Sequence, residues 1–148
     1  MSTAFTAKFP GYAERVRQSL RDQPFMDGLL GATATRIEPG LVEITLPMTP
    51  QLLQPHGNVH GTVATAAADG AAGYAAQTLL AEGYDVVTVE YKINFLAPGI
   101  GDHLTAVGEV VRAGRTLSVC AADIFAVANG ERKLFAHLTA TMMAVENT

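Results

Sequence analysis

Polar and apolar positions alternate along the second half of the chain, and this alternation predicts β-strands. Between Val87 and Phe95 the odd-numbered residues are apolar and those between them are mostly polar, which places the two sets on opposite faces of a strand. Similar segments at 103–112, 116–127 and 132–144 are separated by turn sequences, and Asn129-Gly130 is typical of a two-residue hairpin. The pattern predicts four antiparallel strands that follow one another as a meander.

The first half of the chain combines helical and strand-like periods. Residues 12–21 carry apolar side chains at helical spacing, and Pro24 is expected to end that helix. Two strands are predicted at 31–37 and 41–46, joined by a Pro-Gly turn. A proline-rich loop then leads into a long helix at about 61–80.

The predicted helix at 61–80 consists almost wholly of Ala, Gly and Thr, and Asp69 is its one carboxylate. A helix without charge on nearly every face is expected to be buried on most sides. One long helix against one large antiparallel sheet is an α+β arrangement, in which the sheet must curve around the helix. Because such a sheet leaves open edges, we expect a homo-oligomer that is at least a dimer.

The bulk composition excludes several classes of protein. The 148 residues are 49% apolar and 16% charged, which indicates one ordered domain. A net charge of −4 with scattered basic residues argues against a nucleic-acid partner. The single Cys120, the lack of a secretory leader pattern and the absence of a long apolar run predict a cytoplasmic protein that does not bind membranes.

Three motifs along the chain contain residues that can carry chemistry. The first is His60-Gly61-Thr62, followed by Asp69 nine positions after the His. The second is the strand and turn from Val89 to Pro98, and the third joins Gly101-Asp102 to the segment Gly108–Thr116. In this combination the motifs resemble those of the PaaI-like group of hotdog-fold acyl-CoA thioesterases.

This resemblance implies a hotdog fold, in which a curved antiparallel sheet of roughly six strands wraps a long central helix. It implies a thioesterase domain over 28–148, preceded by an N-terminal helical extension over 1–27. It also implies a dimer or a dimer of dimers (a homotetramer) with active sites at the dimer interface. Thr62 departs from the family, which has a glycine there, and the competing His56-Gly57 pair would place Asp69 four residues too far along.

The start of the long helix predicts an oxyanion site. The first amides of a helix have no intrahelical partner and lie at the positive end of its dipole, so the Gly61 N–H can stabilise a developing oxyanion. Asp69 is expected to be partly desolvated and to act as nucleophile or as general base. By resemblance, it faces the Gly61 amide of a partner subunit, Gln54 helps to hold water or the thioester, and His60 is structural rather than a base.

Other residues are expected to bind the substrate, acyl-CoA. Gly73 either gives the acyl chain room or allows close packing of helix and sheet. Residues on the strand after the helix are similar to positions that line the pantetheine and acyl path: Thr88, Glu90 and Phe95. A predicted hairpin presents two guanidinium groups, and the resemblance implies that it contacts the nucleotide part of coenzyme A. It consists of Arg112, Ala113, Gly114, Arg115, Thr116 and Leu117. Alternatively, the hairpin is an ordinary solvated turn that binds nothing. Phe95 can equally belong to the core.

The predicted activity is hydrolysis of an acyl- or aryl-CoA thioester to a free acid and CoA. Coenzyme A enters as part of substrate and product, and no separate cofactor or metal is expected, because the His56 and His60 pair lies in a turn and lacks a third ligand. Two alternatives are an enoyl-CoA hydratase or dehydratase of the same fold, and a non-catalytic acyl-CoA-binding protein. The identity of the acyl group is left open by the sequence.

Overall fold

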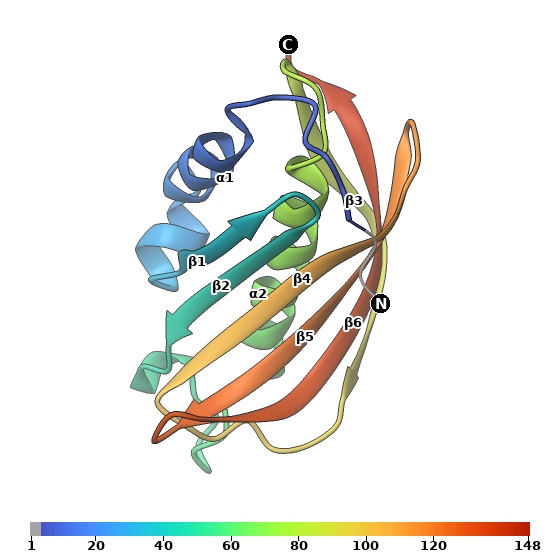
Figure 1. The fold of residues 1–148 in the computed structure, drawn as a ribbon. Coiled ribbons are helices and arrows are strands. Elements are labelled where there is room, and N and C mark those ends of the chain that lie inside the picture. The colour runs from blue at the N-terminus through green and yellow to red at the C-terminus, as the bar shows by residue number, and fades with distance from the viewer. Residues whose placement is uncertain (1–3) are drawn as a thin grey trace.

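A computed structural model describes residues 4–148, in which one curved six-stranded sheet wraps a long helix (Figure 1). Every neighbouring pair of strands is antiparallel, and the strand order is β1-β2-β4-β5-β6-β3. The elements in chain order are α1 (Tyr12–Arg21), a π-helical turn η1 (Pro24–Leu29), β1 (Thr33–Glu38), β2 (Leu41–Pro47), a 3₁₀ turn η2 (Pro50–Leu52), α2 (Gly61–Gln77), β3 (Tyr84–Phe95), β4 (His103–Ala113), β5 (Leu117–Ala128) and β6 (Glu131–Glu146). The α+β architecture with a wrapped central helix is confirmed.

Helix α2 lies against the concave face of the sheet, and its small side chains decide how close the two come (Figure 1). Ten of its 17 residues are buried, most of them alanines. At Gly108 of β4 a Cβ atom would overlap the backbone of Ala71, so a glycine is needed where β4 passes α2 most closely. Burial of α2 on most sides, expected from its lack of charge, is confirmed.

The predicted four-strand meander is wrong at its first step. Strands β4, β5 and β6 do follow one another, but β3 pairs with β6 at the far edge of the sheet and not with β4. The connection from β3 to β4 crosses the end of the β5–β6 pair, where Leu96 N–H donates to Phe135 O at 2.7 Å and Asp102 N–H donates to Val127 O at 2.7 Å. Alternation along one strand indicates its two faces but contains no information about which strand lies beside it.

A β-bulge at Val89 interrupts the alternation predicted for β3. Thr88 pairs with Met142 and Glu90 pairs with Thr141, so Val89 is an extra residue without a partner. Beyond the bulge the two faces exchange, and Thr88 and Glu90 therefore lie on opposite faces of the sheet. The expectation that they share a face was wrong, because a single inserted residue reverses the period-two pattern.

The N-terminal part packs into the same core as the sheet. Val16 and Leu20 of α1 and Met26 of η1 are buried among the core residues. The turn η1 was not predicted, and β1 starts at Thr33 because Gly31 ends η1 with a φ of +65°. The division into an extension over 1–27 and a domain over 28–148 stays a prediction. Within residues 4–148, no helix is long and apolar enough to cross a membrane.

Candidate active site

Asp69 lies in the middle of α2 and is half-buried. Thr88 on β3 donates a hydrogen bond from Oγ1 to Asp69 Oδ1 at 2.8 Å. Burial raises the pKa of Asp69 above its usual range, and the bond from Thr88 opposes this by stabilising the charged form. The expected partial desolvation of this carboxylate is confirmed. A carboxylate with these properties beside a cavity can serve as nucleophile or as base.

A cavity of about 460 Å³ opens beside Asp69, large enough for a small organic group. One wall consists of Asp69, Gly70 and Gly73 of α2, with Thr88 of β3 next to them. A second part of the wall comes from the N-terminal residues and includes Ser19, Phe25 and Met26. The local sequence pattern carries no signal for this second wall, because it depends on how α1 and η1 pack against α2.

Gly73 leaves part of this cavity open. A Cβ atom at this position would lie 3.9 Å from Val86 Cγ1 and 4.0 Å from Met142 Cε, which are ordinary van der Waals distances. Close packing of helix and sheet therefore does not require a glycine here, in contrast to Gly108. The geometry therefore favours the first expected role of Gly73, which is to leave room in the cavity, over close packing of helix and sheet.

The cavity has a polar end that sequence reasoning missed. The Gln77 amide donates from Nε2 to Ser19 Oγ at 3.0 Å and to Asp85 Oδ1 at 2.9 Å. Tyr74 is also buried, and its hydroxyl has no hydrogen-bond partner among residues 4–148. Burial, followed by the nearby charge of Asp85, raises the pKa of Tyr74, so its hydroxyl is neutral at physiological pH.

The start of α2 is capped by His60. Its Nδ1 accepts a hydrogen bond from the Thr62 amide at 3.2 Å and also contacts the Thr62 hydroxyl. Thr65 bonds back to the Gly61 carbonyl at 2.9 Å, and the ring of Phe95 lies 3.0 Å from where a Gly61 Cβ would be. An engaged Nδ1 is consistent with the structural role expected of His60.

The structure does not bring Asp69, Gly61 and Gln54 together within one chain. Gly61 and Asp69 are eight residues apart on one helix, which separates them by about 12 Å along its axis. Within the described part of the chain, the Gln54 side chain makes no hydrogen bond to either residue; its backbone N–H donates to Asn58 O at 2.6 Å. Glu90 lies on the outer face of the sheet, where it accepts a bond from Thr141 at 2.6 Å.

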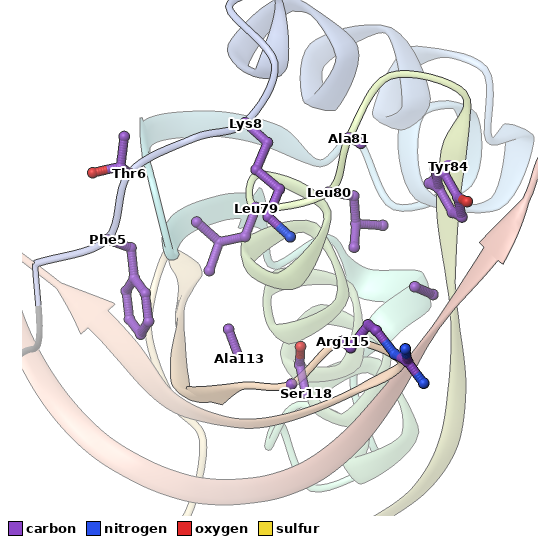
Figure 2. A pocket seen from close by; sticks show the side chains of 12 residues that line it. Phe5, Thr6, Lys8, Leu79, Leu80, Ala81, Tyr84, Ala113, Arg115 and Ser118 are labelled. Atoms are coloured by element: carbon purple, nitrogen blue, oxygen red, sulfur yellow. The ribbon is translucent and has the colours of Figure 1, made fainter.

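The predicted nucleotide-binding hairpin is fully exposed between β4 and β5. Gly114 N–H donates to Leu117 O at 2.9 Å, and a Cβ at Gly114 would overlap that oxygen, so the turn requires a glycine. Ala113, Gly114 and Arg115 line a second pocket of about 520 Å³ near the end of α2 (Figure 2). Arg112, Thr116 and Leu117 are exposed but do not line this pocket.

Cys120 is not a competing nucleophile. The residue is fully buried in β5, as expected for a small strand residue. Burial raises the pKa of its thiol to about 12, so the reactive thiolate is absent at neutral pH.

Comparison with known proteins gives the family. Acyl-coenzyme A thioesterase PaaI of Escherichia coli K12 is 33% identical over 91 residues, which cover 61% of this chain and 63% of PaaI. The chain matches 60–64% of the length of the curated relatives. A thioesterase family protein from Silicibacter pomeroyi superposes with a TM-score of 0.89 at 42% identity, covering 93% of this chain and 100% of that structure.

A hypothetical thioesterase protein from Streptococcus pneumoniae TIGR4, crystallised with coenzyme A, is 31% identical with a TM-score of 0.68. The match covers 78% of this chain and 87% of that one. The PaaI structure itself superposes with a TM-score of 0.79 at 25% identity and covers 93% of this chain and 96% of its own. The model of the Thioesterase superfamily matches residues 56–132. The chain therefore belongs to the thioesterase superfamily, with the hotdog fold of its PaaI-like members.

Proposed function

We propose that this protein is an acyl-CoA thioesterase, which hydrolyses an acyl- or aryl-CoA thioester to a free acid and CoA. The observation that carries the proposal is a half-buried Asp69 carboxylate of raised pKa at the wall of a 460 Å³ cavity. Membership of the thioesterase superfamily and similarity to PaaI support thioester hydrolysis. A related structure contains coenzyme A, which supports the CoA part of the substrate.

Asp69 supplies the reactive oxygen in one of two ways. As a nucleophile, it attacks the thioester carbonyl carbon, the C–S bond breaks to release CoA thiolate, and water hydrolyses the resulting mixed anhydride. As a general base, it takes a proton from the water that attacks the same carbon, and the C–S bond of the resulting tetrahedral intermediate then breaks to release CoA thiolate. Both routes place negative charge on the carbonyl oxygen, which the Gly61 N–H at the helix start is suited to stabilise. Neither route needs a metal or a redox cofactor.

The active site is completed by a second copy of the chain. Asp69 and Gly61 of one chain are too far apart along α2 to act on one carbonyl group, so we assign the Gly61 amide to the partner subunit, together with Gln54. Among residues 4–148, strand β3 pairs on one side only, and four of its apolar side chains are 43–54% exposed: Val87, Val89, Tyr91 and Phe95. An unpaired apolar edge of this kind is suited to pairing with a second chain in a dimer or a dimer of dimers.

Dimerisation and activity should therefore be lost together. Val89→Asp places a charge on the β3 edge and should shift the protein to monomers in light scattering, with loss of hydrolysis. Ile100 is 63% exposed in the β3–β4 connection, and Ile100→Asp serves as the matched control. An active Val89→Asp monomer would show that one chain contains a complete site.

Hydrolysis itself is tested by thiol release from a panel of acyl-CoA thioesters. Asp69→Asn should keep the fold and reduce turnover by on the order of a hundredfold or more. The control is Asp123→Asn, because Asp123 lies on β5 in a 2.6 Å hydrogen bond with the His137 ring and does not line the cavity. Full activity of Asp69→Asn would move the chemistry elsewhere, and hydration of enoyl-CoA without thiol release would favour a hydratase.

A further inference from the structure

The N-terminal segment before α1 forms one side of the second pocket. Figure 2 shows Phe5, Thr6 and Lys8 on that side, Ala113 and Arg115 of the β4–β5 hairpin across from them, and Leu79 and Leu80 between. The pocket has a volume of about 520 Å³, within the range of small-molecule sites. Its lining combines apolar side chains, such as Leu79 and Leu80, with the cationic Lys8 and Arg115.

Two cations, Lys8 and Arg115, line this pocket. Among residues 4–148, neither Lys8 nor Arg115 forms an ion pair, whereas Arg21, Arg36 and Arg132 each do. The lining residues include no Asp or Glu, and Tyr84, which does line the pocket, donates its hydroxyl to Glu146 Oε1 at 3.0 Å. Two unpaired cations from distant parts of the chain are suited to bind phosphate groups.

Aromatic anchors on both sides fix the position of Lys8. The Phe5 ring packs directly over Gly40, where a Cβ would overlap it. The Phe9 ring lies 5.0 Å from the Arg15 guanidinium, and the Phe9 carbonyl accepts a bond from the Tyr12 amide at 3.1 Å. Because the backbone around Lys8 is already ordered, binding of an anion by its ammonium group costs side-chain entropy but little backbone entropy.

Arg15 removes an electrostatic obstacle to a phosphate at this end of α2. A helix carboxyl end carries partial negative charge and repels anions. Here the Arg15 guanidinium donates to three carbonyl oxygens, of Gln77 at 2.6 Å, Leu80 at 2.8 Å and Ala81 at 2.9 Å. The same guanidinium contacts Phe9, so one residue both neutralises the helix end and holds the N-terminal segment against it.

We propose that Lys8, together with Arg115, binds the phosphate groups at the nucleotide end of the CoA ester, so that the N-terminal segment is part of the substrate site. The inference rests on the proposed function. The pocket begins beyond Gln77, which lies about 12 Å from Asp69 along α2. This separation is suited to a ligand whose thioester and phosphates are joined by a long pantetheine arm.

The test compares two esters of the same acyl group. One is the CoA ester, and the other is the N-acetylcysteamine ester, which has neither nucleotide nor phosphate. Lys8→Met should raise KM for the CoA ester about tenfold with little change in kcat, as expected when a charge-assisted contact to a bound phosphate is lost. Hydrolysis of the N-acetylcysteamine ester should be unchanged. Lys8→Arg should restore most of the affinity, and the exposed Lys133→Met is the matched control.

Further arms separate the possible failures. Calorimetric binding of CoA alone measures the role of Lys8 even if no ester is hydrolysed, so loss of the proposed activity and loss of this inference are distinguishable. Dephospho-CoA esters lack the ribose phosphate. If Lys8→Met no longer raises KM with these esters, Lys8 binds the ribose phosphate, and if KM still rises, Lys8 binds the diphosphate. Both results support the proposal. Equal CoA affinity of wild type and Lys8→Met, or an equal loss in Lys133→Met, would overturn it.

Discussion

The hydroxyl of Thr88 on β3 donates a 2.8 Å hydrogen bond to the carboxylate of Asp69 on α2. The bond joins the edge strand of the sheet to the central helix at the wall of the cavity. It stabilises the ionised carboxylate, whereas burial destabilises it, and burial has the larger effect on the pKa. The pKa of Asp69 is therefore set by two opposing effects, and a single substitution at Thr88 can remove one of them.

Removing the Thr88 hydroxyl should shift the pH dependence of hydrolysis. Thr88→Val keeps the shape of the side chain but deletes the donor, so the pKa of Asp69 should rise further. Because either catalytic role requires an ionised carboxylate, the acidic limb of the kcat/KM profile should move to higher pH. The pH-independent rate above that limb should change less.

Thr141→Val is the control for this experiment, since Thr141 donates to Glu90 on the other face of the sheet. Its profile should coincide with that of the wild type. An acidic limb that stays in place, or moves to lower pH, in Thr88→Val would contradict the assignment of the limb to Asp69.

Asp69→Asn should not destabilise the protein at neutral pH. The folded-state pKa of Asp69 lies above its unfolded value, so this carboxyl favours folding most below the unfolded pKa, and that contribution is lost as pH rises through the folded-state pKa. At neutral pH the wild type holds an ionised, half-buried carboxylate that the neutral amide replaces. The variant's Tm should equal or exceed that of the wild type, and the difference should shrink on acidification. A lower Tm at neutral pH would indicate that the charge stabilises the fold.

Two glycines that face the α2–sheet interface should respond oppositely to alanine. Gly108→Ala forces a Cβ into the backbone of Ala71 and should reduce the free energy of unfolding by about 1–3 kcal/mol or more. Gly73→Ala fits without a clash and should raise it by up to about 1 kcal/mol, because alanine favours a helix interior. Denaturant unfolding measures both.

The same Gly73→Ala substitution should change selectivity, because the added methyl group occupies part of the cavity. Rates with the bulkiest acyl-CoA esters should fall relative to those with short ones. A uniform change across the panel would show that Gly73 does not border the acyl group.

Replacing Arg15 should loosen the carboxyl end of α2. Arg15→Met keeps much of the aliphatic length but removes the guanidinium bonds to three carbonyl groups, of which Gln77 O keeps its bond from the Leu80 amide; this should reduce the free energy of unfolding by about 2–3 kcal/mol. Hydrogen exchange should accelerate at the amides of the last turn of α2. Arg17→Met is a suitable control, since Arg17 is exposed on the same helix and makes a long 3.9 Å ion pair. Equal effects of the two substitutions would argue against a specific capping role.

Most secondary-structure elements could be predicted from the chain alone. The helix at Tyr12–Arg21 and the start of α2 at Gly61 coincide with the expected positions, because helical spacing and glycine-rich turns are local signals. The turn at Asn129-Gly130, with positive φ at both residues, is likewise local. The desolvation of Asp69 followed from the lack of charge around it in the helix.

Other features depend on contacts between residues distant in sequence. The place of β3 beside β6, the bulge at Val89 and the N-terminal walls of both cavities were not predicted. Local periodicity shows which face of an element is apolar. The sequence alone therefore determined that a helix is buried against a curved sheet, and that Asp69 is a candidate catalytic carboxylate within that helix. Only the folded structure decides which elements pack together across these faces, because an apolar face can be covered by any of several elements that are distant in sequence.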